Sequence, residues 1–169
     1  MAAAEVSIDT REIRGLAEIL SKAKLSAGDR QELLRQIGVE MESQTQERFD
    51  TQEDPEGNPW KLLAQKTAEY YTEKFPGATL LVREGGLRDS VESQVQDSWS
   101  VLVGATKEYA AIHQFGGDIT PKSAKALFVP GYGLLQKVTI PARPYLGVSS
   151  QNAAEIASIA QKFIVEKLL

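Results

Sequence analysis

The chain has no cysteine among its 169 residues and a single histidine. The lack of cysteine excludes a disulfide scaffold and any zinc or iron–sulfur site that depends on thiolates, and it fits a reducing compartment. Apolar runs are only a few residues long, as at Val101–Val103. The start of the chain lacks the basic and then apolar pattern of a signal peptide. We therefore expect no membrane-spanning segment and no membrane partner.

Basic residues are outnumbered by acidic ones, 19 to 23, which gives a net charge of −4. A protein that grips nucleic acid of any sequence neutralises phosphates with a basic surface, so the balance argues against that role. We expect no sequence-specific nucleic-acid partner either. The charge is also uneven, because residues 40–56 carry −6 and the rest of the chain sums to +2. The acids of that stretch are Glu40, Glu42, Glu47, Asp50, Glu53, Asp54 and Glu56.

Aromatic residues are absent before Phe49, and all twelve lie between Phe49 and Phe163. The first 48 residues are therefore expected to form helices that add little bulk to a core. This pattern predicts a helical appendage over residues 1–27, packed on a main domain over residues 28–169.

Apolar periodicity places helices at both ends of the chain and strands between them. Asp9 with Glu12 has capping-box spacing, and Ser26 or Asp29 can begin a second helix. The predicted helices are Asp9 or Thr10 to Leu20, Ser26 or Asp29 to beyond Met41, Trp60 to about Tyr71, and Ser149 or Ser150 to the C-terminal region. Glu108–Gln114 is predicted as a short helix or a loop. The predicted hairpins pair Val91–Val95 with Trp99–Val103, and Ala126–Val129 with Gln136–Ile140. The class is α+β, with N-terminal helices, a mainly antiparallel sheet of about four strands and a C-terminal helix.

Residues that could carry chemistry are sparse. His113 has no spacing to a serine and a carboxylate that singles out a triad, so we expect a hydrogen-bonding structural role, with a catalytic base as the alternative. The acids from Asp50 to Glu56 lack calcium-loop spacing and are interrupted by Pro55, so a solvated face is expected rather than a metal site. No phosphate-loop, dinucleotide or zinc-protease motif occurs. The sequence thus predicts a binding or structural module with no cofactor, no metal and no enzymatic activity.

Four short segments, in this order and spacing, resemble the phage virion morphogenesis family, the tail-completion group of contractile-tailed phages and prophages. The resemblance covers about residues 30 to 169, which makes residues 28–169 the family domain. Glu84 stands where family members often carry serine or threonine, and Asp118–Ile140 matches no motif. The segments are Arg48-Phe49 with Asp54-Pro55-Glu56-Gly57-Asn58-Pro59-Trp60-Lys61-Leu62, then Leu81–Val91, Tyr109–Gly117 and Ile140–Gly147.

The resemblance implies a structural protein that completes the phage tail and joins it to the head, in the manner of a tail terminator or neck protein. It implies a ring-forming homo-oligomer, with a hexamer favoured, that contacts tail, neck or head proteins. The protein is then expected in the bacterial host cytoplasm during assembly and later in the virion. Alternatives are a capsid or head morphogenesis adaptor of the same virion and a small hydrolase using His113. The family-motif residues and candidate interface are Trp60, Leu87, Arg88, Ser90, Tyr109, His113, Gln114, Phe115, Gly116, Gly117, Pro141, Arg143 and Pro144.

A ring needs two unlike surfaces on one small domain. We consider the half-polar helix through Glu40–Phe49 and the loop Asp118–Lys125 as candidates. Arg88 and Arg143 can bind a neighbour's carboxylates or fold back onto their own chain. The acids expected to face a lumen or a neighbouring subunit are Glu40, Glu42, Glu47 and Asp50.

Overall fold

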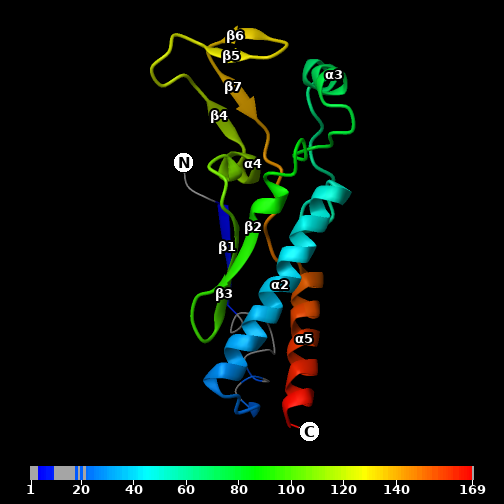
Figure 1. The fold of residues 1–169 in the computed structure, drawn as a ribbon, viewed down its shortest axis with the longest axis vertical. Helices are drawn as coiled ribbons and strands as arrows, with labels where there is room; N and C mark the ends of the chain where they lie inside the picture. The colour runs from blue at the N-terminus through cyan, green and yellow to red at the C-terminus, as the bar shows by residue number, and fades with distance from the viewer. Residues whose placement is uncertain (1–3, 10–17, 19, 21, 169) are drawn as a thin grey trace.

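Helix α2, Ala27–Thr51, forms the spine of the molecule, a computed structural model that describes residues 4–9, 18, 20 and 22–168. Ser26 begins the helix as predicted, because its Oγ accepts a hydrogen bond from Asp29 N at 3.1 Å. The helix ends where Gln52 turns left-handed and its N–H donates to Arg48 O at 2.8 Å. Helix α5, Ser150–Leu168, lies alongside α2 (Figure 1).

A three-stranded antiparallel sheet, in the order β1-β3-β2, covers one face of α2. Its strands are β1 (Ala4–Asp9), β2 (Val91–Val95) and β3 (Ser100–Ala105). The central strand β3 is nearly all buried, because both neighbours pair with it and α2 packs on it. Gly38 allows the close approach of helix and sheet, since a Cβ there would lie 2.5 Å from Ser93 Oγ. The hairpin predicted for β2 and β3 is confirmed.

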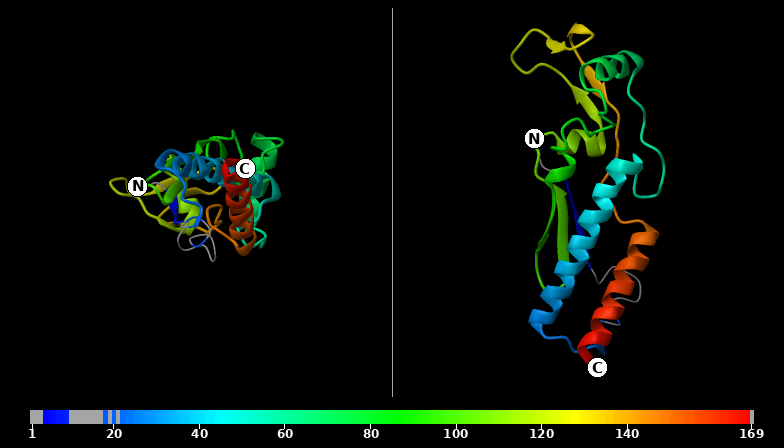
Figure 2. Two further views of the ribbon diagram at one scale, coloured as in Figure 1. Left: turned by 90° about the horizontal axis from the view of Figure 1, so that it is seen from below. Right: turned by 45° about the vertical axis from the view of Figure 1, so that its right-hand side comes forward.

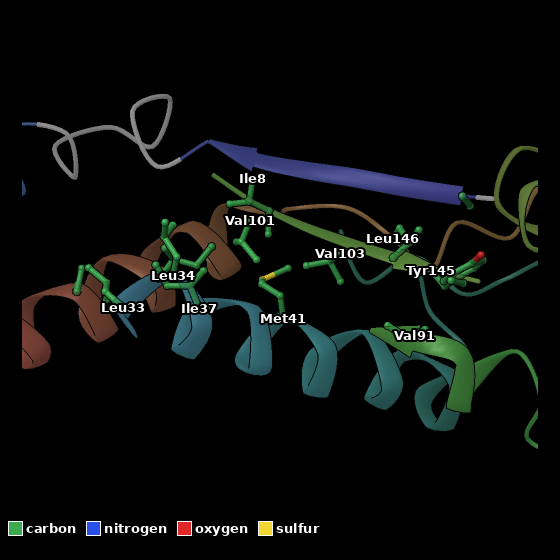
Figure 3. Close-up of a cluster of buried hydrophobic side chains, with 14 of the residues drawn as sticks. Ile8, Leu33, Leu34, Ile37, Met41, Val91, Val101, Val103, Tyr145 and Leu146 are labelled. Atoms are coloured by element: carbon green, nitrogen blue, oxygen red, sulfur yellow. The ribbon is translucent and has the colours of Figure 1, made fainter. Parts of the chain in front are cut away.

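The core lies between α2 and this sheet, with α5 closing a second side (Figure 3). Leu33, Leu34, Ile37 and Met41 from α2 are each 2% exposed or less. The expectation that the first 48 residues add little bulk to the core is therefore wrong. Aliphatic side chains at helical spacing supply that bulk without aromatics.

The N-terminal segment contributes strand β1, which the sequence analysis does not predict. Ala4 and Ile8 are buried, and β1 pairs antiparallel with β3 from Ala4↔Ala105 to Asp9↔Ser100. The helix predicted from Asp9 or Thr10 to Leu20 falls mainly on residues 10–17, 19 and 21, which lie outside the described residues.

A narrow extension, here called the arm (residues 117–140), projects beyond the end of α2 (Figures 1 and 2). Its strands are β4 (Gly117–Ile119), β5 (Leu127–Val129), β6 (Gly133–Leu135) and β7 (Val138–Ile140). The predicted pairing of residues 126–129 with 136–140 is wrong, because β5 pairs with β6 and β7 pairs with β4. Gly133, at φ 85°, and the bond from Tyr132 N to Val129 O close the hairpin earlier than predicted.

The remaining helices are short and lie near the arm. Helix α3, Gln65–Lys74, begins five residues after Trp60, so the predicted helix starts later than expected. Helix α4, Ala110–Phe115, decides in favour of the helical alternative for that segment, and the start of α5 at Ser150 agrees with the sequence. The α+β class and the antiparallel pairing are confirmed. Within the described part of the chain, no helix combines the length and the apolar character needed to cross a membrane.

Candidate functional site

The last turn of α2 buries a charged side chain, Arg48, which is only 7% exposed. Its Nη1 donates to Tyr145 O at 2.8 Å and to Gly147 O at 3.2 Å, and its Nη2 donates to Asn152 Oδ1 at 2.8 Å. Burial lowers the pKa of Arg48, and the nearby carboxylates of Asp54 and Glu56 oppose that shift. The guanidinium therefore fastens α2 to the segment that enters α5.

Trp60 and Arg143 tie the segment after α2 to the same stretch. Trp60 Nε1 donates to Pro144 O at 2.8 Å, while Arg143 Nε donates to Lys61 O at 2.7 Å and Nη2 to Leu62 O at 3.2 Å. Burial lowers the pKa of Arg143, with Tyr71 opposing. Arg143, one of the two arginines considered for an interface, thus folds back onto its own chain.

Gln114 of α4 belongs to the same arrangement, and its side-chain amide both accepts and donates hydrogen bonds. Its Oε1 accepts from Tyr145 N and Leu146 N at 3.0 Å each, and its Nε2 donates to Leu146 O at 2.9 Å. Tyr145 is fully buried, and its hydroxyl donates to Ala110 O at 3.2 Å. Burial raises the pKa of Tyr145 above its usual range. We call Arg48, Trp60, Gln114, Arg143 and Tyr145 the buried clamp.

The buried clamp joins segments that are far apart in the sequence. Residues 48–62, 110–117 and 141–152 meet there, and the rings of Phe49 and Tyr145 lie 5.2 Å apart. Because the polar groups are bonded to backbone of the same chain, the clamp holds the base of the arm against the end of α2.

The glycine pair after α4 lets the chain turn against the clamp. Gly116 has φ 68°, and a Cβ there would lie 2.6 Å from Ala142 N. Gly117 has φ 143° and a looser environment, with Ile112 Cδ1 3.0 Å from the position of a Cβ. Pro141 directly follows β7 and is half-buried, as is Pro144, whose carbonyl accepts the hydrogen bond from Trp60 Nε1. These motif residues shape the chain rather than present polar groups.

His113 lies beside a cleft of about 400 Å³ between α3, α4 and the segment 79–87. Its Nδ1 is buried and has no hydrogen-bond partner among the described residues. Burial, and then the charge of Arg143, lower its pKa, which favours the neutral ring. A triad base needs a carboxylate on that nitrogen to orient it, and none of the described carboxylates bonds there.

The turn before β2 holds three more motif residues. Leu87 is buried, and Ser90 Oγ donates to its carbonyl at 2.7 Å. Arg88 pairs with Asp89 at 3.1 Å and with Asp50 at 3.4 Å, so it too contacts its own chain. Two motif residues do face outward, because Tyr109 is 42% exposed and Phe115 is 68% exposed.

The four acids predicted to share one surface are separated in the structure. Glu42 accepts a hydrogen bond from Ser93 N at 2.6 Å and so covers the edge of β2. Asp50 pairs with Arg88. Glu40 and Glu47 line a groove of about 410 Å³ between α2 and α5. The other carboxylates lining this acidic groove are Glu53, Asp54, Glu56 and Glu155. Among the described residues, no cluster of histidine and acidic side chains is arranged to hold a metal ion.

Arg48, Tyr145 and Asn152 have central roles that the candidate set omits. Arg48 lies seven residues after Met41, on the buried stripe of α2, in a segment otherwise rich in acids. A lone base at a core position of a helix is the signal that could have identified it. Tyr145 and Asn152 carry no comparable signal, because their partners come from other segments.

These features, an elongated α+β protein with an internal clamp and a projecting arm, are typical of a structural module. The chain matches the phage virion morphogenesis family over residues 11–164 and belongs to that family. It is 30% identical over 158 residues to Mu-like prophage FluMu G protein 2 of Haemophilus influenzae, covering 94% of this chain and 95% of that protein. It is 28% identical over 132 residues to the putative capsid assembly protein G of Escherichia phage Mu, covering 76% of this chain and 75% of that protein. No solved structure matches. The chain is therefore a phage virion assembly protein.

Proposed function

We propose that this protein completes the phage tail and joins it to the head, and that it acts as a ring-forming homo-oligomer, with a hexamer favoured. The observation that carries the proposal is the combination of family membership with two unlike surfaces on one subunit. One is the arm with its exposed apolar side chains, and the other is the acidic groove. Rings close through such heterologous contacts, in which one patch meets a different patch of the neighbour.

Two measurements test this role. Light scattering of the purified protein, alone and mixed with purified tails, should give a ring-sized particle or binding confined to tail ends. A phage that lacks the protein should accumulate filled heads and separate tails in electron micrographs of lysates. Defective heads in that lysate would contradict the proposal.

A second candidate is a head morphogenesis adaptor of the same virion. It is supported by the description of the phage Mu relative as a putative capsid assembly protein. Immunogold labelling separates the two, because the label falls on the tail end in one case and on the head in the other. In both cases we expect the protein in the host cytoplasm during assembly and in the virion afterwards, in contact with head, neck or tail proteins.

In the proposed ring, the acidic groove either lines the lumen or contacts a neighbouring copy of the chain. Carboxylates lining a lumen would repel passing DNA over the screening length of about 8–10 Å. Replacing Glu40 and Glu47 by glutamine tests this. A lumen role predicts normal assembly with impaired DNA delivery, and a contact role predicts loss of assembly. The matched control replaces Glu42 and Asp50, whose carboxylates face their own chain.

A further inference from the structure

The arm exposes two large apolar side chains at its tip. Phe128 of β5 and Leu134 of β6 are 74% and 73% exposed. They are direct cross-strand partners in the antiparallel register, so they lie side by side on one face of the hairpin. The residues on the opposite face of both strands are half-buried. An apolar pair of this size held out from the body is a surface that a partner can cover.

The arm is also held in place before any partner binds. Tyr132 Oη and Thr67 Oγ1 of α3 lie 3.1 Å apart, and Lys66 Nζ lies 5.7 Å from the centre of the Tyr132 ring. At the base of the arm, Asp118 accepts from Lys137 Nζ at 2.8 Å and from Thr139 Oγ1 at 2.6 Å. Because these contacts fix the tip, binding through it loses little conformational entropy.

Charge indicates which surface covers the arm. Lys122 and Lys125, in the loop between β4 and β5, are exposed and make no ion pair with any described residue. The carboxylates of the acidic groove likewise form no ion pair within the described chain. Arg48 is the one cation among the described residues that line the acidic groove, and its guanidinium donates to acceptors inside the fold. Each surface thus lacks the counter-charge that the other carries.

The two surfaces lie on opposite sides of the molecule. The loop between β4 and β5 overhangs one side of the molecule, whereas the end of α2 and the segment that follows α2 lie on the other side. Figure 1 and the right-hand view of Figure 2 both show this arrangement. They cannot meet within one subunit. Side by side in a ring, the overhanging loop of one subunit reaches toward the acidic side of the next, which is the geometry of a heterologous contact.

We infer that the arm is the docking element for a second copy of this chain. Lys122 and Lys125 lie against the carboxylates around Glu53 and Glu56 of the neighbour, and the pair Phe128 and Leu134 packs beside them. Leu62, six residues after Glu56 and 76% exposed, offers an apolar counterpart on the same segment. The inference rests on the proposed ring and names the surfaces that close it.

Cysteine cross-linking tests the contact directly, because the natural chain contains no cysteine. The variant Lys125→Cys/Glu56→Cys is oxidised, or treated with a short thiol cross-linker, as concentrated free protein and within complemented virions. A heterologous contact gives a ladder of covalent species beyond the dimer, ending at the ring number. Each single variant gives no ladder, and neither does the control Lys125→Cys/Lys162→Cys. Absence of a ladder from both the free protein and the virions overturns the inference.

Charge reversal supplies a second readout. The variant Lys122→Glu/Lys125→Glu should raise the concentration for half-assembly at least tenfold, and adding Glu53→Lys/Glu56→Lys should restore it. Phe128→Ser/Leu134→Ser should weaken assembly while leaving the melting temperature unchanged, and Lys162→Glu is the control. If these variants assemble on tails as well as the natural chain does, the arm contact is wrong and the tail role stands. If the natural chain ignores tails, the tail role fails, and the ladder of the free protein still decides the contact.

Discussion

Replacing Arg48 by methionine removes the centre of the buried clamp while keeping an apolar stem of similar length. The substitution takes the donor away from Tyr145 O and Gly147 O, whereas Asn152 Oδ1 keeps the bonds from Ser149 N and Ser149 Oγ at 2.8 Å each. Each buried acceptor left without a donor costs about 1–3 kcal/mol. The two carbonyls together predict a loss of about 2–6 kcal/mol, with the lower part of that range favoured because the Gly147 carbonyl is only partly buried.

Thermal and chemical denaturation measure this loss. In a domain of this size, about 2–6 kcal/mol corresponds to a fall of about 4–24 °C in melting temperature. The denaturation midpoint should drop with an unchanged slope. The melting temperature of Arg48→Lys should lie between those of the natural protein and Arg48→Met. An ammonium keeps the charge but lacks the planar guanidinium that reaches three acceptors.

The matched control is Arg35→Met on the same helix. The Arg35 side chain is 62% exposed and pairs with Glu32 at the surface. Its replacement should leave the melting temperature unchanged. If Arg48→Met also melts within about 3 °C of the natural protein, the clamp does not stabilise the fold and the reasoning is refuted.

Three further predictions concern stability. Because His113 is the only histidine and its pKa is lowered in the fold, the unfolded chain takes up the proton first. Stability should therefore fall as pH drops from 7 through the ordinary histidine value of 6.5, and His113→Asn should flatten that part of a melting-temperature profile. Gly116→Ala should cost about 2–4 kcal/mol in chemical denaturation, because positive φ and a backbone clash both oppose it. Gly28→Ala should cost nothing, because a Cβ there would lie 3.8 Å from Ser26 Oγ, an ordinary van der Waals contact. Ser26→Ala should cost about 1 kcal/mol by the same assay, and an unchanged midpoint would show that the cap is dispensable.

The parts of the fold that the sequence predicts depend on local signals. Ser26 and the stripe from Leu33 to Met41 predict α2 because a cap and a helical period lie within a few turns. The alternation from Val91 to Val103 predicts the β2–β3 hairpin because its two halves are adjacent.

The parts that the sequence does not predict depend on distant partners. Ala4, Val6 and Ile8 alternate with polar residues over six residues, a common strand length, but a strand is stable only where another strand offers an edge to pair with. That edge is β3, more than ninety residues later in the chain. The arm shows the same limit, since β7 pairs with β4 across the β5–β6 hairpin and no local pattern distinguishes this from the predicted pairing.

In the candidate site, too, the motif residues differ from the segment that matches no motif. The motifs that carry the family resemblance include Arg48, Trp60, Gln114 and Arg143, and these side chains bond to backbone of their own chain. A polar group already bonded inside the fold has nothing left to offer a partner without breaking that bond. We therefore expect contacts with other molecules from residues outside the clamp. The segment that matches no motif, Asp118–Ile140, is the one that projects and exposes unpaired charge and apolar surface. The motif residues thus fix the base of the arm to the body, and the arm is the segment through which we propose that the chain contacts a second copy.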